Sequence, residues 1–172
     1  MPTFELQFAP DQIESLASRF GYMDESRLLA IGEKVRGRGY YTRGEFIEVC
    51  AWKSARSRPK IAANSREAIV SATRMALAAD DEGLRMQHLL ALTGVGVPTA
   101  STLLYCAFPA DYPILDIRAL ESLGVKPRSQ YPVSFWLLYL AACRALAASR
   151  GVSIRTLDKA LWQHSKERST SQ

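Results

Sequence analysis

The sequence has few of the residues that bind metals or cross-link a chain. Its 172 residues include three cysteines, Cys50, Cys106 and Cys143, and two histidines, His88 and His164. The cysteines lie far apart and form neither a CxxC pair nor an even set, so we interpret them as buried thiols in a reducing cytosol. A zinc site is not expected from so few imidazoles and thiols, and we predict that the protein needs no cofactor.

Long apolar runs are also missing. The most apolar stretch, residues 133–143, is too short to span a bilayer, and the charged Arg144 comes directly after it. We interpret it as part of a buried core helix. Residues 1–10 have no basic region and no apolar core, so they do not resemble a signal peptide. We therefore expect a cytoplasmic protein, nucleoid-associated if it is prokaryotic, with no membrane partner.

The chain does have enough apolar side chains for a core, and an excess of positive charge. Hydrophobic residues make up 48% of the sequence, and the formal net charge is +5. A basic balance of this kind favours an anionic partner. The length fits one domain. We predict a single helical domain over residues 1–165 and a frayed polar tail over residues 166–172.

Apolar residues recur at helical spacing along most of the chain, and no segment has a convincing strand pattern. About nine helices are expected, beginning near residues 10, 24, 42, 64, 84, 98, 116, 131 and 153. Thr42 and Glu45 predict a capping box for the third helix, and Pro59 is expected in a loop after it. The predicted fold class is all-α, a compact domain of packed short helices.

The most informative stretch is residues 89–124, LLALTGVGVPTASTLLYCAFPADYPILDIRALESLG. An apolar helical run ends at Thr93, and Pro98 opens a second helix, where its missing N–H costs nothing. The intervening Gly94–Gly96 turn lets backbone approach another group closely, and the first amides of the next helix suit a phosphate oxygen. A tight turn between helices, with glycine needed only for a positive φ, explains the same residues equally well.

The pattern LTGVGVPTA at residues 92–100, followed by an apolar helix and PILD at residues 113–116, resembles the helix-hairpin-helix DNA glycosylase superfamily, which includes endonuclease III. In that family the hairpin holds a DNA phosphate through its backbone. The resemblance places a helix-hairpin-helix at about residues 84–107. The phosphate-binding residues that it implies are Gly94, Val95, Gly96 and Thr99. The four-cysteine tail that holds an iron–sulfur cluster in some members is absent, and only the resemblance implies a monovalent cation at the hairpin carbonyls.

Asp116 lies at the distance from the hairpin at which the family has an invariant aspartate, so the resemblance implies a catalytic carboxylate here. Breaking a glycosylic bond develops positive charge on the sugar, and a fixed carboxylate stabilises that charge. Asp116 also suits the N-cap of the helix after it, and the two roles are compatible. Members that also cut the DNA backbone carry a lysine where this chain has Pro98. The resemblance therefore implies a monofunctional enzyme that releases a base with water.

A basic segment, residues 34–60, reads KVRGRGYYTRGEFIEVCAWKSARSRPK and holds eight Lys or Arg residues and two Glu. Aromatic residues interleave with the positive charge, a combination that suits phosphate neutralisation and base stacking. The predicted DNA-contact or base-pocket residues are Tyr40, Tyr41, Trp52, Lys53, Arg56 and Arg58. A solvated basic face over an ordinary aromatic core is the alternative. Lys53, next to Trp52, could supply the amine that position 98 lacks, although a surface lysine is the simpler interpretation.

These observations favour a DNA glycosylase without abasic-site lyase activity, which hydrolyses the bond between sugar and a damaged or modified base in double-stranded DNA. The alternative is a non-catalytic helix-hairpin-helix protein that only binds DNA. A third interpretation is a helical interaction module in which residues 94–96 are merely a turn. Salt-dependent DNA binding separates the first two from the third, and base release separates the first from the second.

Overall fold

The computed structural model describes residues 1–22 and 24–171, and these residues form ten α-helices and two short 3₁₀ helices, with no strand. The predicted all-α fold class is therefore confirmed. The structure has one helix more than the sequence predicts, because α4 (Arg58–Ala62) replaces the loop expected around Pro59. Pro59 lies in the first turn of α4, where a missing N–H removes no helix hydrogen bond.

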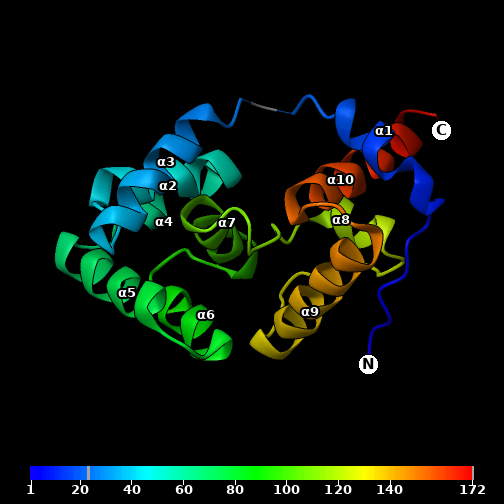
Figure 1. Cartoon of the computed structure of the whole chain (residues 1–172). Coiled ribbons are helices and arrows are strands. Elements are labelled where there is room, and N and C mark those ends of the chain that lie inside the picture. Colours follow the sequence, from blue (N-terminus) through cyan, green and yellow to red (C-terminus); the bar gives the residue numbers. More distant parts are fainter. Residues whose placement is uncertain (23, 172) are drawn as a thin grey trace.

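The helices form two groups that lie side by side (Figure 1). The first group contains α2 (Ser26–Arg38), α3 (Arg43–Lys53), η2 (Ala55–Ser57), α4, α5 (Arg66–Ala78), α6 (Glu82–Leu90) and α7 (Val97–Ala107). The second group contains η1 (Pro10–Gln12), α1 (Ile13–Ser18), α8 (Ile117–Ser122), α9 (Val133–Arg150) and α10 (Ile154–Thr170). The chain thus starts in the second group, builds the whole first group, and returns after α7.

The N-terminal residues complete the second group. The Glu5 N–H donates to the Leu123 carbonyl at 3.0 Å, and the Gln7 N–H donates to the Ser122 carbonyl at 2.9 Å. Gly124 has a φ of +72°, and a Cβ added to it would lie 2.6 Å from the Gln7 side-chain nitrogen. The extended N-terminal segment therefore lies against the end of α8, and α1 then packs on α10.

Several helices begin at the residues that local capping and proline signals in the sequence predict. The Thr42 side chain accepts from the Glu45 N–H and Glu45 accepts from the Thr42 N–H, so the predicted capping box at α3 is confirmed. Pro98 lies in the first turn of α7, as predicted. Asp116 is the N-cap of α8 and accepts from the Arg118 N–H at 2.8 Å. These caps satisfy amide groups that a helix start leaves unpaired.

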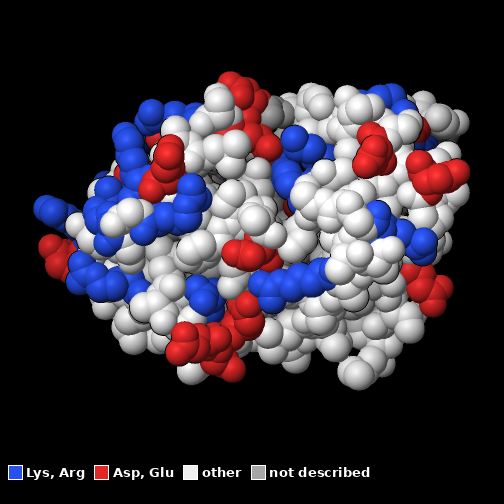
Figure 2. All heavy atoms as spheres, viewed as in Figure 1, with Lys and Arg blue, Asp and Glu red and all other residues white. Residues whose placement is uncertain are grey.

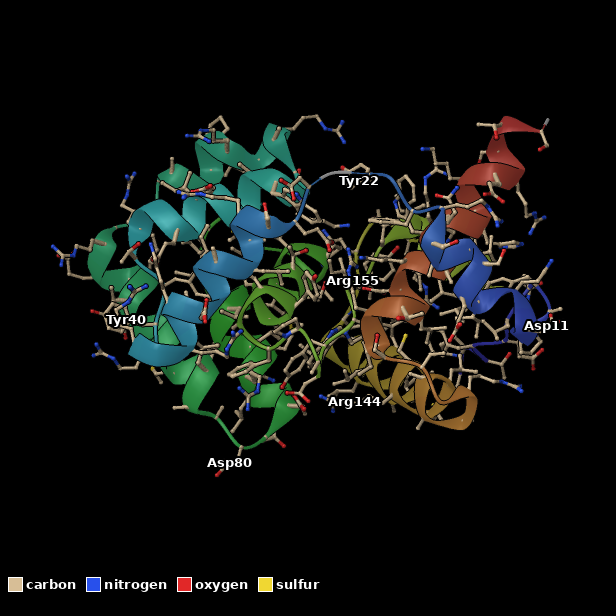
Figure 3. The ribbon with its side chains drawn as sticks, turned by 45° about the horizontal axis from the view of Figure 1, so that its top comes forward. Asp11, Tyr22, Tyr40, Asp80, Arg144 and Arg155 are labelled. Carbon is tan, nitrogen blue, oxygen red and sulfur yellow. The ribbon has the colours of Figure 1, made fainter. Side chains whose placement is uncertain are left out.

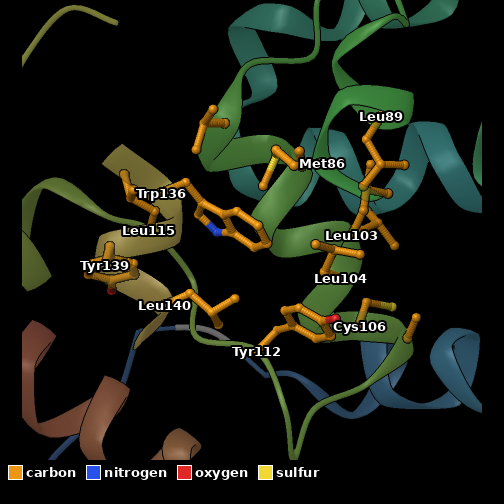
Figure 4. Close-up of a cluster of buried hydrophobic side chains, with 14 of the residues drawn as sticks. Met86, Leu89, Leu103, Leu104, Cys106, Tyr112, Leu115, Trp136, Tyr139 and Leu140 are labelled. Carbon is orange, nitrogen blue, oxygen red and sulfur yellow. The ribbon is translucent and has the colours of Figure 1, made fainter. Parts of the chain in front are cut away.

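One hydrophobic core runs through both groups (Figure 4). Helix α9 was predicted to be a buried core helix, and its Trp136 and Tyr139 are fully buried. The Trp136 ring stacks on Tyr112 with centroids 6.3 Å apart, and the Tyr139 hydroxyl donates to the Ile114 carbonyl at 2.8 Å. The loop between α7 and α8, which carries Tyr112 and Ile114, is thus anchored in the core. The position of Asp116 at its end is fixed accordingly.

The three cysteines lie in closely packed parts of the core. Helices α2 and α7 approach so closely that a Cβ added to Gly32 would lie 1.8 Å from the Cys106 carbonyl oxygen. Cys50, Cys106 and Cys143 are unbridged and buried, as predicted. Burial raises the pKa of the Cys106 thiol to about 11, so this thiol is protonated at neutral pH.

The predicted frayed tail is wrong for residues 166–170, because α10 continues to Thr170. The Lys166 ammonium lies over the Trp162 ring, 5.1 Å from its centroid, and the Ser169 hydroxyl donates to the Ser165 carbonyl at 2.9 Å. These contacts within α10 extend its polar end. Residue 172, the last of the predicted tail, lies outside the described residues.

Candidate functional site

A cavity of about 510 Å³ opens between the two helix groups. This volume is within the range of small-ligand pockets. The residues that line the cavity are Phe20, Tyr22, Trp52, Lys53, Ile114, Asp116, Ile117, Arg118, Ala119, Glu121, Arg155, Asp158, Trp162 and Ser169. Figure 3 shows Tyr22 and Arg155 in the region where the two groups meet. The cavity brings together three residues that the sequence singles out: Trp52, Lys53 and Asp116.

Asp116 and Lys53 come from opposite groups and form an ion pair in this cavity. The Lys53 Nζ lies 2.6 Å from Asp116 Oδ2. Their side chains are 15% and 26% exposed, respectively. The other carboxylate oxygen of Asp116 accepts the Arg118 N–H at the start of α8. Both oxygens are therefore held by hydrogen bonds, and the carboxylate is fixed at the cavity wall.

Lys53 reaches the cavity because it is the last residue of α3. The buried side of this helix carries Phe46, Val49 and Cys50, which anchor the helix in the core of the first group. Ser54 leaves the helix with φ of −150°, so the chain turns away immediately after Lys53. Trp52 and Lys53 are thus presented on the last turn of a rigid helix.

Aromatic rings from three separate segments meet beside this ion pair. The Tyr22 ring lies 5.9 Å from the Trp52 ring and 5.1 Å from the Trp162 ring, measured between centroids. Phe20 packs edge-on against Trp162 at 5.3 Å. The indole N–H of Trp52 is buried and has no hydrogen-bond partner among the described residues. Flat side chains of this kind can stack on a planar ligand.

Buried charges form the deeper wall of the cavity. Asp158 accepts the Ile114 N–H at 2.8 Å and pairs with Arg155 at 3.1 Å. Arg155 also pairs with Glu25, which precedes α2 in the first group. Burial raises the pKa of Asp158 to about 6, and the Arg155 guanidinium opposes that rise. This chain of charges links α10 to the start of α2 across the boundary between the groups.

The glycine turn between α6 and α7 packs on α4. Gly94 has a φ of +79°, and a Cβ added to it would lie 2.8 Å from Lys60 Cβ and 3.1 Å from Ile61 N. Asn64 joins the same contact, because its side chain exchanges two hydrogen bonds of 2.9 Å with the backbone of Thr93. Packing within the protein therefore accounts for glycine at position 94.

Gly96 differs from Gly94. Its φ is −97°, which any residue adopts, and an added Cβ would meet only Pro98 Cδ, at 3.8 Å. Gly96 is exposed at the start of α7, where the first amides lack helix partners. Val95 and Thr99 are 8% and 6% exposed, so their side chains face the protein interior. Of the predicted phosphate-binding residues, Gly96 has the most accessible backbone.

Arg56 lies in η2, between α3 and α4, and Arg58 is the first residue of α4. Both are exposed, and neither side chain forms a hydrogen bond or ion pair within the described part of the chain. The cavity residue Lys53 lies just before η2, and the glycine turn rests on α4. Two exposed cations therefore lie, along the chain, between the cavity residue Lys53 and the α4 residues that contact the glycine turn.

The remaining two predicted residues lie elsewhere. The prediction for Tyr41 is wrong: its side chain is fully buried, and its hydroxyl donates to the Leu103 carbonyl at 2.6 Å. Tyr40 lies between the guanidinium groups of Arg38 and Arg74, 4.9 and 4.8 Å from its ring centroid. Figure 3 shows Tyr40 at the outer end of the first group, so it does not line the cavity.

Several cavity residues had no sequence signal, above all Tyr22, Arg155 and Trp162. They lie at opposite ends of the chain and meet only because α10 and the segment before α2 lie together at the boundary between the groups. Within α10, Trp162 and Arg155 are part of an ordinary amphipathic helix. Lys and Arg side chains are also spread over the surface of the first group in Figure 2, with acidic side chains between them. Surface charge alone therefore does not mark the site.

Comparison with known proteins gives no assignment: no family model, no curated protein and no solved structure matches this chain. Among residues 1–22 and 24–171, no group of three His, Cys, Asp or Glu side chains is arranged to hold a metal ion. In the same residues, no single helix is both long and apolar enough to cross a membrane. The geometry of the cavity is therefore the basis for a functional proposal.

Proposed function

We propose that the protein is a DNA glycosylase, which releases a damaged or modified base from double-stranded DNA. The observation that carries this proposal is the Asp116 carboxylate, held in a cavity lined by aromatic rings. Departure of a base leaves an oxocarbenium-like sugar, and a fixed carboxylate beside C1′ stabilises that charge. Asp116 can also orient or deprotonate the attacking water.

The aromatic residues suit the base that such an enzyme must take out of the duplex. A glycosylase extrudes its target nucleotide and holds it in a pocket, where flat side chains stack on the base. Trp52, Tyr22 and Trp162 surround the same cavity as Asp116. The base would lie among these rings while its sugar faces the carboxylate.

The surface beside the cavity suits a DNA backbone. Arg56 and Arg58 are exposed there, and the unpaired amides at the start of α7 come directly after the glycine turn. The resemblance of residues 92–100 and Asp116 to the helix-hairpin-helix glycosylases supports the same interpretation. Base release by water needs no protein nucleophile, and Pro98 stands where strand-cutting members of that family carry a lysine.

The test is single-turnover base release from duplexes that carry uracil, a thymine mispair, 8-oxoguanine, an alkylpurine or a modified cytosine, with alkali added afterwards to cut abasic strands. We expect release of at least one base, and a loss of about 100-fold or more in Asp116→Asn. Asp80→Asn, which removes an exposed carboxylate from the loop before α6, is the matched control and should keep full activity. Equal activity in Asp116→Asn and the wild type would disprove the catalytic assignment.

A non-catalytic DNA-binding protein is the second candidate, and one observation favours it. Asp116 is already used twice within the protein, as the cap of α8 and as the partner of Lys53. A structural role would explain both contacts without any reaction. Tight, salt-dependent duplex binding with no base release from any duplex of the panel would establish this second function.

A further inference from the structure

Buried side chains from separate helices hold the backbone that leads to Asp116. The Ile114 N–H donates to Asp158 of α10 at 2.8 Å. The Ile114 carbonyl accepts the Tyr139 hydroxyl of α9 at 2.8 Å. Asp158 and Tyr139 are 5% and 0% exposed, respectively. Burying a polar group is costly unless it is hydrogen-bonded, so both side chains depend on Ile114 as much as Ile114 depends on them.

Ser101 holds the next backbone group in the same way. The Leu115 N–H donates to Ser101 Oγ at 2.9 Å, and the Ser101 hydroxyl donates to the Pro98 carbonyl at 2.7 Å. Ser101 is fully buried on α7. Helices α7, α9 and α10 therefore each supply one buried polar side chain to the two residues directly before Asp116.

Asp158 differs from the other two side chains because it can carry a charge. It lies in the wall of the cavity, and its Oδ2 accepts both the Ile114 N–H and the Arg155 guanidinium, the latter at 3.1 Å. Hydrogen bonds to an ionised acceptor are about twice as strong as those between neutral groups. Ionised Asp158 therefore holds Ile114 more firmly than protonated Asp158 does.

We propose that Asp158 is the positioning residue of Asp116, and that base release requires Asp158 in its ionised form. The inference rests on the proposed function and adds regulation of the same site by pH. Asp158 acts through the backbone of Ile114 and does not take part in the reaction itself. A shift of about 1 Å in a reacting group can slow a reaction about 100-fold, so a loosened Ile114 lowers the rate of base release without weakening DNA binding.

The surroundings of Asp158 bring its ionisation close to neutral pH. Burial raises the pKa of Asp158 to about 6. The Arg155 guanidinium and the Ile114 N–H oppose that rise, and the Asp116 carboxylate adds to it. Protonation of Asp158 thus removes one of two carboxylate charges from the cavity wall and weakens the hold on Ile114.

The neighbouring groups leave Asp158 to respond in this range. Burial raises the pKa of Tyr105 on α7 and of Tyr139 and Cys143 on α9, so all three are neutral near pH 6. Burial lowers the pKa of His164, but this ring faces Ser122 and Phe8. The charged groups on or beside α10 have partners of their own: Glu25 pairs with Arg155 and Lys159, Lys53 with Asp116, Arg19 with Glu167, and Arg118 and Glu121 bond to Ser165.

The experiment measures single-turnover base release between pH 5 and pH 8, on the duplex of the panel that releases its base fastest. Asp158→Asn keeps the shape and an acceptor for Ile114 but carries no charge. We expect the wild-type rate to fall about 10-fold from pH 7.5 to pH 5, with an apparent pKa of about 6. Asp158→Asn should be about 10-fold slower than the wild type at pH 7.5, should lose this dependence on pH, and should bind the duplex equally well.

Two matched controls should keep the wild-type dependence on pH. Asp11→Asn removes an exposed carboxylate of the second group, at its outer end in Figure 3. His164→Gln removes the imidazole of the same helix. Tyr139→Phe removes the other contact to Ile114 without a change of charge, so it should slow base release about 5-fold at every pH and keep the dependence on pH.

A purely structural role for Asp158 is the competing explanation, and stability separates the two. The pKa of Asp158 is higher in the folded protein than in the unfolded chain, so its contribution to stability is lost as the pH rises through about 6. Asp158→Asn should therefore gain stability relative to the wild type between pH 5 and pH 7.5, in urea unfolding. A variant that loses stability and activity in parallel would overturn the proposal.

Amide NMR signals test the positioning without any reaction. The Ile114 N–H bonds to Asp158, and the Arg118 N–H bonds to Asp116 Oδ1 at 2.8 Å. In the wild type, both signals should shift with the same apparent pKa of about 6, and in Asp158→Asn neither should. A shift of the Ile114 signal alone would overturn the proposal, because Asp158 would then titrate without moving Asp116.

Failure of this inference is distinguishable from failure of the proposed function. Base release with the same pH profile in Asp158→Asn and the wild type would overturn the role of Asp158 and leave the glycosylase intact. Coupled NMR shifts without base release from any duplex would instead reject the glycosylase, while the positioning of Asp116 by Asp158 would stand.

Discussion

The two ends of the basic segment, residues 34–60, have the same kind of composition and different surroundings. At the first end, Arg36 donates to the Ala107 carbonyl at 2.7 Å, and Arg38 pairs with Glu45. At the second end, Arg56 and Arg58 are exposed, and neither has a side-chain partner in the described part of the chain. The first set of cations stabilises the protein itself, whereas the second set is available to a ligand.

The aromatic residues of the segment divide in the same way. Tyr41 is fully buried, and Tyr40 lies between two arginines at the outer end of the first group, whereas Trp52 lines the cavity. Proximity in sequence therefore says little about shared function. The helix packing decides which residues point toward the boundary between the two groups.

Among substitutions that compare the two ends of the basic segment, replacement of Trp52 should have the largest effect on base release and duplex binding. Trp52→Ala removes a stacking surface worth about 1–3 kcal/mol, so base release or abasic-duplex binding should fall about 5- to 150-fold. Tyr40→Ala, at the first end of the segment, should change neither. Single-turnover kinetics measure the rate of base release in both variants, and duplex titrations measure their DNA affinity. A larger loss in Tyr40→Ala than in Trp52→Ala would reverse the assignment of the two ends.

The two exposed arginines should have an intermediate effect. In the double variant Arg56→Ser/Arg58→Ser, the loss of two phosphate contacts should reduce the slope of log affinity against log salt by about 2. Lys34→Ser, an exposed cation at the first end, is the control and should leave the slope unchanged. Fluorescence anisotropy at several salt concentrations measures both slopes. Weaker binding with an unaltered slope in the double variant would exclude phosphate contacts at these positions.

Replacement of Tyr41 should lower the stability of the protein and leave its affinity for DNA unchanged. Its hydroxyl is buried and donates to the Leu103 carbonyl, so Tyr41→Phe should lower the free energy of unfolding by about 1–2 kcal/mol. Tyr40→Phe should change the free energy of unfolding by less than about 0.5 kcal/mol. Urea unfolding, monitored by circular dichroism, measures both variants. Duplex affinity that falls in Tyr41→Phe while its stability stays unchanged would contradict the buried position.

Much of the fold was predictable because its signals are local. The capping box of Thr42 and Glu45 and the positions of Pro98 and Asp116 at helix starts depend on residues within one helical turn. Helix α4 was missed because Pro59 resembles a loop residue in sequence but also fits the first turn of a helix. The extension of α10 was missed because a polar helix end has no apolar periodicity.

The candidate site was predictable only in part. Asp116 was singled out by the resemblance to the helix-hairpin-helix glycosylases, in which an aspartate follows the hairpin at this distance. Trp52 and Lys53 were singled out by their basic and aromatic neighbours. The contact between Lys53 and Asp116 joins residues that are 63 positions apart. Tyr22 and Trp162 are farther apart still, and neither has a distinctive neighbour in sequence. No periodicity or spacing rule connects residues from different helices at such separations.

By itself, the sequence determined the all-α class, most of the helix starts and the buried state of the three cysteines, because each depends on short-range periodicity, capping or hydrophobicity. Only the tertiary structure decided that Gly94 serves packing on α4, that Tyr41 belongs to the core, and that Lys53 meets Asp116. The physical reason is that packing of the whole chain sets the positions of helices relative to one another. The cavity exists only at the boundary that this packing creates.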